Sequence, residues 1–141
     1  MKVMFCHDGE EMGQKALKAA VEFFKPHKAD MIILCVNSDI VDASMEVDSL
    51  TEEFQKEHKA VIDQSAQWVA EHGMDVDVII ATGDPREMVV AAIEKKKPDV
   101  VVVARRKKST RESAFRKSLS AYLVKNAGCN LFIMGPCNYG E

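Results

Sequence analysis

Residues 105–117 hold the densest group of side chains that can bind a ligand. Seven of them are basic and one, Glu112, is acidic, so the stretch has a formal charge of +6 in a chain whose net charge is −3. Guanidinium and ammonium groups at this density bind phosphate. The stretch is followed by Ser118, where we predict the start of a helix, and the free N–H groups of a helix start also bind anions. The stretch is therefore interpreted as an anion site or as a solvated basic loop. Its basic residues are Arg105, Arg106, Lys107, Lys108, Arg111, Arg116 and Lys117.

A second candidate group is the carboxylate of Asp8, which with Gly9 follows the first apolar run. The sequence has no Gly-x-x-x-x-Gly-Lys-Ser/Thr phosphate loop and no Gly-x-Ser-x-Gly elbow. Cys6 and His7 are adjacent in a predicted strand, so their side chains point to opposite faces and cannot readily form a dyad. These features favour a binding protein over an enzyme. A nucleotide-dependent hydrolase or transferase remains the alternative, which ATP turnover abolished by Asp8→Ala would support.

The apolar pattern alternates between strand-like and helix-like periods along the chain, which is typical of an α/β fold. Asp84 is the predicted N-cap of one helix, with Pro85 at its first position and Glu87 completing a capping box. Gly73 is expected to end the preceding long helix. We predict strands at residues 3–6, 31–36, 76–80, 100–104 and 131–134, and helices at 12–24, 50–69, 85–97 and 118–126.

These elements predict one parallel five-stranded sheet in the order 3-2-1-4-5, with helices on both faces. The alternating third strand, residues 76–80, is expected to be half exposed and near an edge. Such sheets bind ligands at the carboxyl ends of the strands, where the winding direction switches. That switch would lie between strands one and four, so we expect residues 7–13 to lie beside residues 105–117.

The chain resembles the universal stress proteins over nearly its whole length. The resemblance rests on Asp8-Gly9, on Gly83-Asp84-Pro85, on Pro98-Asp99 before a valine-rich strand, and on residues 118–134, which match the family's ending. It implies one domain, residues 1–141, with a flavodoxin-like or adenine nucleotide alpha-hydrolase-like fold. It also implies a small stress-response or regulatory protein that forms a homodimer largely through the final strand, here Leu131, Phe132, Ile133 and Met134.

The resemblance also implies a nucleotide site. The ATP-binding branch of the family has glycines where this chain has Ala104, Lys107 and Lys117, whereas the serine that follows is retained as Ser118. Glycines allow a backbone to approach phosphates closely, so their loss predicts that the usual ATP-binding mode is absent. In the alternative, lysines bind ATP or another phosphate-bearing nucleotide through their side chains. The candidate binding residues are Asp8, Gly9, Ala104, Arg106, Lys107, Lys117 and Ser118, with no catalytic residue and no metal.

Two acidic residues, Glu10 and Glu11, follow Asp8-Gly9 and place negative charge near any bound phosphate. On the basic side, Ser109, Thr110 and Ser113 lie among arginines and lysines, so a phosphate added to one of them would be held by its neighbours. We therefore also consider regulation by phosphorylation.

Composition excludes several other classes. The chain has 141 residues, of which 47% are hydrophobic, and no apolar run approaches the roughly 20 residues that span a bilayer. The four cysteines form no Cys-x-x-Cys pair and the four histidines lack zinc-site spacing, so we expect reduced thiols and no metal. A pI of about 5.8, with only Phe115 among the basic residues, makes nucleic acid an unlikely partner. The short apolar start does not resemble a signal peptide, which favours the cytoplasm.

Overall fold

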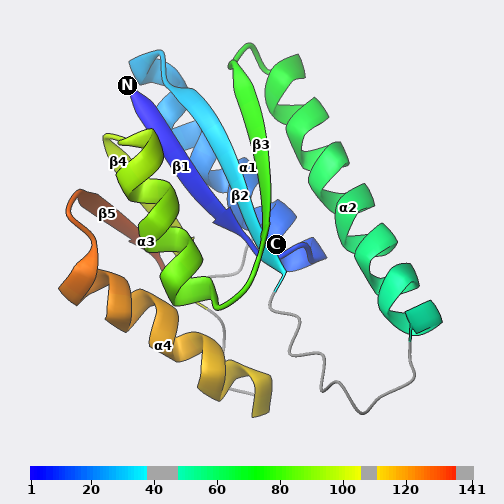
Figure 1. Cartoon of the computed structure of the whole chain (residues 1–141). Coiled ribbons are helices and arrows are strands. Elements are labelled where there is room, and N and C mark those ends of the chain that lie inside the picture. Colours follow the sequence, from blue (N-terminus) through cyan, green and yellow to red (C-terminus); the bar gives the residue numbers. More distant parts are fainter. Residues whose placement is uncertain (38–47, 106–110, 136–141) are drawn as a thin grey trace.

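The computed structural model describes residues 1–37, 48–105 and 111–135, and the side chains of these residues apart from 48–55 and 111–118. Five parallel strands form one sheet in the order β3-β2-β1-β4-β5, as the sequence predicts (Figure 1). The central strand pairs with its neighbours at Phe5↔Ile33 and Phe5↔Val102. The strands are β1 (Lys2–His7), β2 (Asp30–Asn37), β3 (Val76–Thr82), β4 (Val100–Ala104) and β5 (Asn130–Met134).

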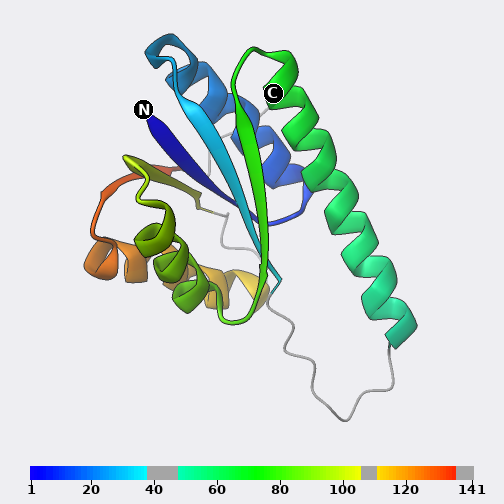
Figure 2. The same ribbon diagram turned by 45° about the horizontal axis from the view of Figure 1, so that its top comes forward.

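Helices cover both faces of this sheet, with α1 and α2 on one side and α3 and α4 on the other (Figure 2). Successive residues of β1 alternate between the faces, so Val3 and Phe5 pack with Leu17 of α1, whereas Met4 packs with Leu123 of α4. None of the helices in the described ranges is long and apolar enough to cross a membrane. The helices are α1 (Glu11–Phe24), the short 3-10 turn η1 (Lys25–His27), α2 (Asp48–Glu71), α3 (Pro85–Lys96) and α4 (Arg111–Asn126).

Asp84 and Pro85 begin α3 where the sequence predicts. The Asp84 carboxylate accepts a hydrogen bond from the Arg86 N–H at 2.8 Å, and Pro85 occupies the first helical position. The helix ends at Lys97, whose backbone is left-handed (φ 48°) and whose N–H donates to the Ile93 carbonyl. As the sequence predicts, β3 is an edge strand that exposes Val78, and Gly73 (φ 86°) follows the end of α2.

The left-handed conformation of Lys97 gives a testable stability effect. Replacing Lys97 by glycine removes the clash between Cβ and the backbone, and we expect it to stabilise the fold by about 1 kcal/mol. Lys95→Gly is the control, because Lys95 is an exposed residue inside the same helix, where glycine destabilises by about 1 kcal/mol. Chemical denaturation measures both effects. A loss of stability in both variants would contradict the assigned strain.

The start of α4 differs from the prediction. The helix begins at Arg111, whereas the sequence analysis expected its first turn near Ser118. Residues 111–117 were interpreted as loop because they are charged, yet arginine, glutamate, alanine and lysine are all good helix formers. Ser118 is the eighth residue of α4, so it is not an N-cap and its N–H belongs to the interior of the helix.

Candidate functional site

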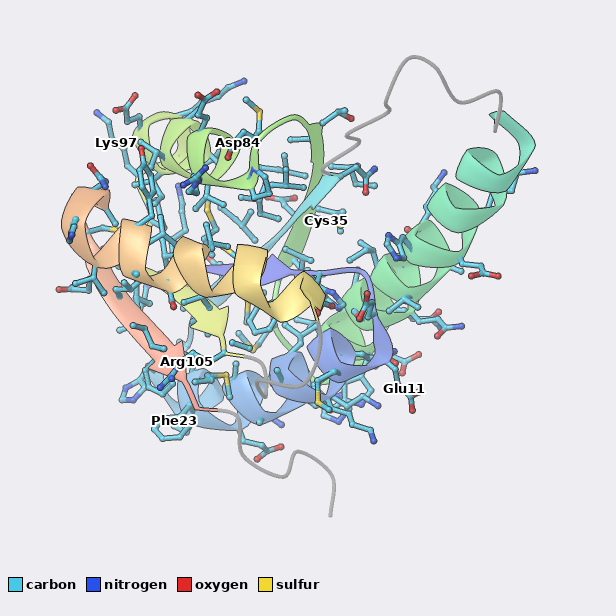
Figure 3. The ribbon with its side chains drawn as sticks, turned by 90° about the horizontal axis from the view of Figure 1, so that it is seen from below. Glu11, Phe23, Cys35, Asp84, Lys97 and Arg105 are labelled. Atoms are coloured by element: carbon cyan, nitrogen blue, oxygen red, sulfur yellow. The ribbon has the colours of Figure 1, made fainter. Side chains whose placement is uncertain are left out.

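The sheet changes its winding direction between β1 and β4, and the candidate site lies at the carboxyl ends of these strands. Phe5 pairs with Val102, so the carboxyl ends of the parallel strands β1 and β4 meet at one edge, where Asp8 follows β1 and Arg105 follows β4. Figure 3 views this edge and labels Glu11 at the start of α1 and Arg105 after β4. The topology therefore brings an acidic turn and the start of the basic stretch to one edge, as predicted.

The Asp8 carboxylate is held over the first turn of α1. Its Oδ1 accepts a hydrogen bond from the Glu10 N–H at 2.8 Å, and its side chain is 24% exposed. Glu11 adds a second negative charge in the same turn. The amino end of α1 is thus occupied by the chain's own carboxylates, which disfavours a phosphate there.

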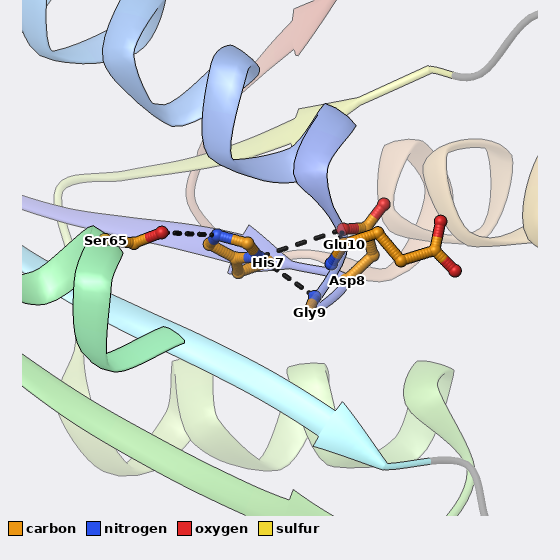
Figure 4. A network of polar contacts seen from close by, with 5 residues as sticks. All are labelled: His7, Asp8, Gly9, Glu10 and Ser65. Carbon is orange, nitrogen blue, oxygen red and sulfur yellow. Dashed lines mark hydrogen bonds and ion pairs between the residues drawn. The ribbon is translucent and has the colours of Figure 1, made fainter. Parts of the chain in front are cut away.

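His7 fixes the turn that carries Asp8, and Figure 4 shows its contacts. The Gly9 N–H donates a hydrogen bond to Nδ1 at 2.9 Å, and Nε2 lies 3.0 Å from the Ser65 hydroxyl of α2. Because Nδ1 accepts, the neutral ring carries its proton on Nε2, which donates to Ser65. His7 and Ser65 are both buried, so each satisfies the polar group of the other.

The protonation state of His7 bears on catalysis. Burial lowers its pKa from 6.5 to about 4, the Asp8 carboxylate opposes this shift, and His58 adds to it. His7 is therefore neutral at pH 7. Since its Nε2 already carries a proton, the ring cannot accept one from Ser65, so this pair is not an activated serine nucleophile.

Two glycines make the turn possible. Gly9 has φ 78°, and a Cβ there would approach Cγ of His58 to 2.9 Å. Gly13 lies under the Asp8 carboxylate, and a Cβ on it would overlap Asp8 Oδ1. Glycine is thus required at both positions by close approach, and at Gly9 also by the backbone.

On the β4 side the described residues are Ala104 and Arg105. Ala104 is the last residue of β4 and half-buried, and the exposed Arg105 donates its N–H to the Met134 carbonyl at 2.8 Å. Lys117 and Ser118 lie in α4, where the structure gives the backbone path only. Arg106 and Lys107 fall outside the described residues. The structure thus brings Asp8, Gly9 and Ala104 to one edge.

The candidate phosphorylation positions add little to this site. Ser109 and Thr110 lie outside the described residues, and Ser113 lies in α4 at a position without a described side chain. Among the described residues, no group of three or more His, Cys, Asp or Glu side chains could hold a metal ion.

Three cysteines are free thiols, and Cys137 lies outside the described residues. Burial raises the pKa of Cys6 to about 12, with a smaller effect of Cys129, and burial together with the Asp8 charge raises the pKa of Cys35 to about 11. These buried sulfurs are protonated at neutral pH and are poor nucleophiles. Cys6 and His7 pack on opposite faces of the sheet, as predicted.

Sequence reasoning missed the roles of His7, His58 and Ser65. It considered the histidines only as metal ligands, and His7 also as a partner of Cys6. One signal was present, because a histidine at the end of a buried strand needs a polar partner. That the partner is Ser65, 58 residues away, depends on how α2 packs and cannot be read from local pattern.

Comparisons with known proteins agree with this architecture. Residues 1–134 match the model of the universal stress protein family. The universal stress protein YxiE of Bacillus subtilis (strain 168) is 27% identical over 100 residues, which cover 63% of this chain and 68% of that protein.

Two solved structures of universal stress proteins have the same fold. One, in complex with cAMP, superposes with a TM-score of 0.71 and 17% identity over 97% of this chain and 98% of that one. Another, from Arabidopsis thaliana with AMP bound, superposes with a TM-score of 0.68 and 19% identity, over 97% of this chain and 92% of that one. The chain thus has the fold of these universal stress proteins. Because the family model spans 134 of the 141 residues, the chain belongs to the universal stress protein family.

Proposed function

We propose that this universal stress protein is a non-catalytic, homodimeric regulatory protein that binds an adenine mononucleotide at the carboxyl edge of β1 and β4. The observation that carries the proposal is the partly exposed carboxylate of Asp8, fixed at the switch point of the sheet. A carboxylate in this place can accept hydrogen bonds from ribose hydroxyl groups. The binding mode differs from that of the ATP-binding branch, because Ala104 replaces the first glycine of its motif.

The ligand we favour has one phosphate, as in AMP or cAMP. Two family members with this fold are complexes with these nucleotides. Within this chain, Asp8, Glu10 and Glu11 cluster at the start of α1 and would repel the additional charges of a triphosphate. The single phosphate would face the basic residues that follow β4, beginning with Arg105.

Thermal unfolding with and without nucleotide tests this proposal. A ligand that binds only the folded state stabilises it by RT ln(1 + [L]/Kd), which is about 1.4 kcal/mol at ten times Kd. We expect AMP or cAMP to raise the Tm, ATP to raise it less, and inorganic phosphate to leave it nearly unchanged. We expect Asp8→Asn to raise the Kd for the nucleotide at least tenfold, and so to reduce the shift in Tm.

A matched control is available on α3. Asp84 makes the same local contact as Asp8, with its Oδ1 2.8 Å from the N–H two residues later, but it follows the edge strand β3 and caps α3. Asp84→Asn should therefore leave the nucleotide effect unchanged. A protein whose Tm does not respond to any adenine nucleotide would contradict the proposal, and equal effects of Asp8→Asn and Asp84→Asn would contradict the role of Asp8.

The proposed dimer interface is the edge strand β5, predicted from Leu131, Phe132, Ile133 and Met134. Ile133 is 39% exposed, and Phe132 lies beside the 61% exposed ring of Phe23, with 5.1 Å between ring centroids. An apolar edge strand of this kind pairs readily with another strand. A second copy of the chain, pairing edge to edge, would cover Ile133 and Phe23 together.

Sedimentation measures this association directly. We expect the wild type to sediment as a dimer at micromolar concentration and Ile133→Glu to sediment at the 15.7 kDa monomer mass, because a charge at the paired edge would be buried. Val124→Glu is the control, since Val124 is 63% exposed on α4 and not on β5. A monomeric wild type would contradict the proposed interface.

The cellular role proposed here is stress response or regulation in the cytoplasm. The free thiols of Cys6, Cys35 and Cys129 suit a reducing compartment. An enzyme of nucleotide hydrolysis or transfer is the competing class. ATP turnover that Asp8→Ala abolishes would favour it.

A further inference from the structure

The turn after β1 is tied to α2 by a buried polar bridge that the nucleotide proposal does not use. Ser65 is fully buried on the face of α2 that presents Ile62 and Val69 to the sheet. A hydroxyl in such apolar surroundings is unfavourable unless it is hydrogen-bonded. Its partner is Nε2 of His7, which reaches it from the end of β1.

The bridge continues through the imidazole ring into the ligand edge. Nδ1 on the other side of the ring accepts the Gly9 N–H, and the next N–H, that of Glu10, donates to Asp8 Oδ1. Asp8 is thus held through the backbone on one side and through its own carboxylate on the other. Because the Gly9 N–H can only donate, it selects the ring form with a free Nδ1, and in this form the protonated Nε2 donates to the Ser65 hydroxyl.

We propose that His7 and Ser65 are positioning residues, which hold the Asp8-Gly9 turn in the geometry that receives the ligand. This inference rests on the proposed nucleotide site. The residues act through the turn, since both are buried and neither can contact a ligand at the edge. Removing the bridge should loosen the turn without removing any group from the site.

The groups around His7 agree with this role. Asp8 follows it after the end of β1, and Cys35 pairs with it on β2. His58 and Ser65 face it from α2, and α1 approaches it at Gly13. The first turn of α1 can come this close because Gly13 has no side chain, and a Cβ there would lie 3.0 Å from Nδ1. Protonating Nδ1 would set two N–H donors against each other at Gly9, so the ordered turn requires the neutral ring.

The test uses Ser65→Ala, with Ile62→Val as its matched control. Both changes shorten one buried side chain of α2, but only the first removes a partner of His7. We expect Ser65→Ala to raise the Kd for AMP about tenfold, measured by calorimetry, and to speed amide hydrogen exchange at Gly9 and Glu10 about tenfold. Ile62→Val should change neither Kd nor these two amides relative to global stability. His7→Asn keeps an acceptor near the Nδ1 position and should restore part of the Gly9 protection that His7→Val loses.

The outcomes separate this inference from the nucleotide proposal. Wild-type AMP affinity in Ser65→Ala, or equal losses in Ser65→Ala and Ile62→Val, would overturn the positioning role. A wild type that binds no adenine nucleotide would refute the proposed function, and hydrogen exchange would then decide alone. Faster exchange at Gly9 and Glu10 in Ser65→Ala would support the bridge as the device that orders the turn, whereas unchanged exchange would overturn it.

Discussion

Lowering the pH from 7 to 4.5 is expected to reduce the unfolding free energy of the wild type by about 2 kcal/mol more than that of His7→Asn. The reason is the buried ring of His7, whose pKa burial lowers from 6.5 to about 4. The asparagine side chain of the variant offers an acceptor to the Gly9 N–H but does not titrate in this range.

The direction of the effect follows from which state binds the proton first. Well above pH 6.5 the ring is neutral in the folded and the unfolded state, so His7 adds no pH dependence to the unfolding free energy. Between pH 6.5 and about 4 the unfolded chain binds a proton that the folded chain excludes, and stability falls as the pH falls. Below about pH 4 both states are protonated, and the accumulated loss, about 3 kcal/mol, no longer grows.

Urea denaturation at several pH values measures the difference between the two proteins. Carboxylates also titrate toward acid pH, but they do so in both proteins, so the difference curve isolates His7. His27→Asn, on the exposed turn after α1, is the control for replacing a histidine outside the buried turn. If the unfolding free energies of the wild type and His7→Asn changed in parallel with pH, the pKa of His7 would not be lowered in the folded state.

Gly9→Ala is expected to destabilise the protein by about 2–3 kcal/mol. The left-handed backbone at Gly9 (φ 78°) costs a residue with a Cβ about 1–2 kcal/mol. The added Cβ would also press on the His58 ring at 2.9 Å, and crowding of this kind costs about 1 kcal/mol or more. The turn would shift, and the Gly9 bond to His7 would weaken with it.

Gly73→Ala separates these two contributions. Gly73 has a similar φ of 86°, but a Cβ there meets nothing within 4 Å, so only the backbone cost of about 1–2 kcal/mol applies. Chemical denaturation of both variants gives the crowding cost by difference. If Gly9→Ala cost no more than Gly73→Ala, the close packing of His58 on the turn would be refuted.

The fold was predictable because its signals are local. Apolar runs such as residues 100–104 fixed the strands, Asp84-Pro85 fixed a helix start, and topological rules ordered the sheet. The start of α4 was not predicted correctly, because a run of charged residues is compatible with a loop and with a helix. Helix propensity in residues 111–117 gave the better signal there.

The site was predictable only in part, for a similar reason. Asp8 and Gly9 follow directly from the end of a strand, and the switch point places them beside β4. The contacts of His7 with Ser65 and of Gly9 with His58 join residues about 50 positions or more apart. Such contacts depend on the tilt and depth of α2 against the sheet, and a one-dimensional pattern does not encode these.

The position of β1 also determines the order in which the chain can complete its fold during synthesis. This first strand is central, and its second neighbour β4 begins only at Val100; the Lys2 carbonyl accepts the N–H of Asp99, 97 residues away. Until β4 leaves the ribosome, one side of β1 has backbone groups without a partner strand, beside the apolar side chains of Val3, Met4 and Phe5. The nascent chain thus keeps an unpaired apolar strand edge until β4 has been made, and wrong strand pairing competes with folding during this interval.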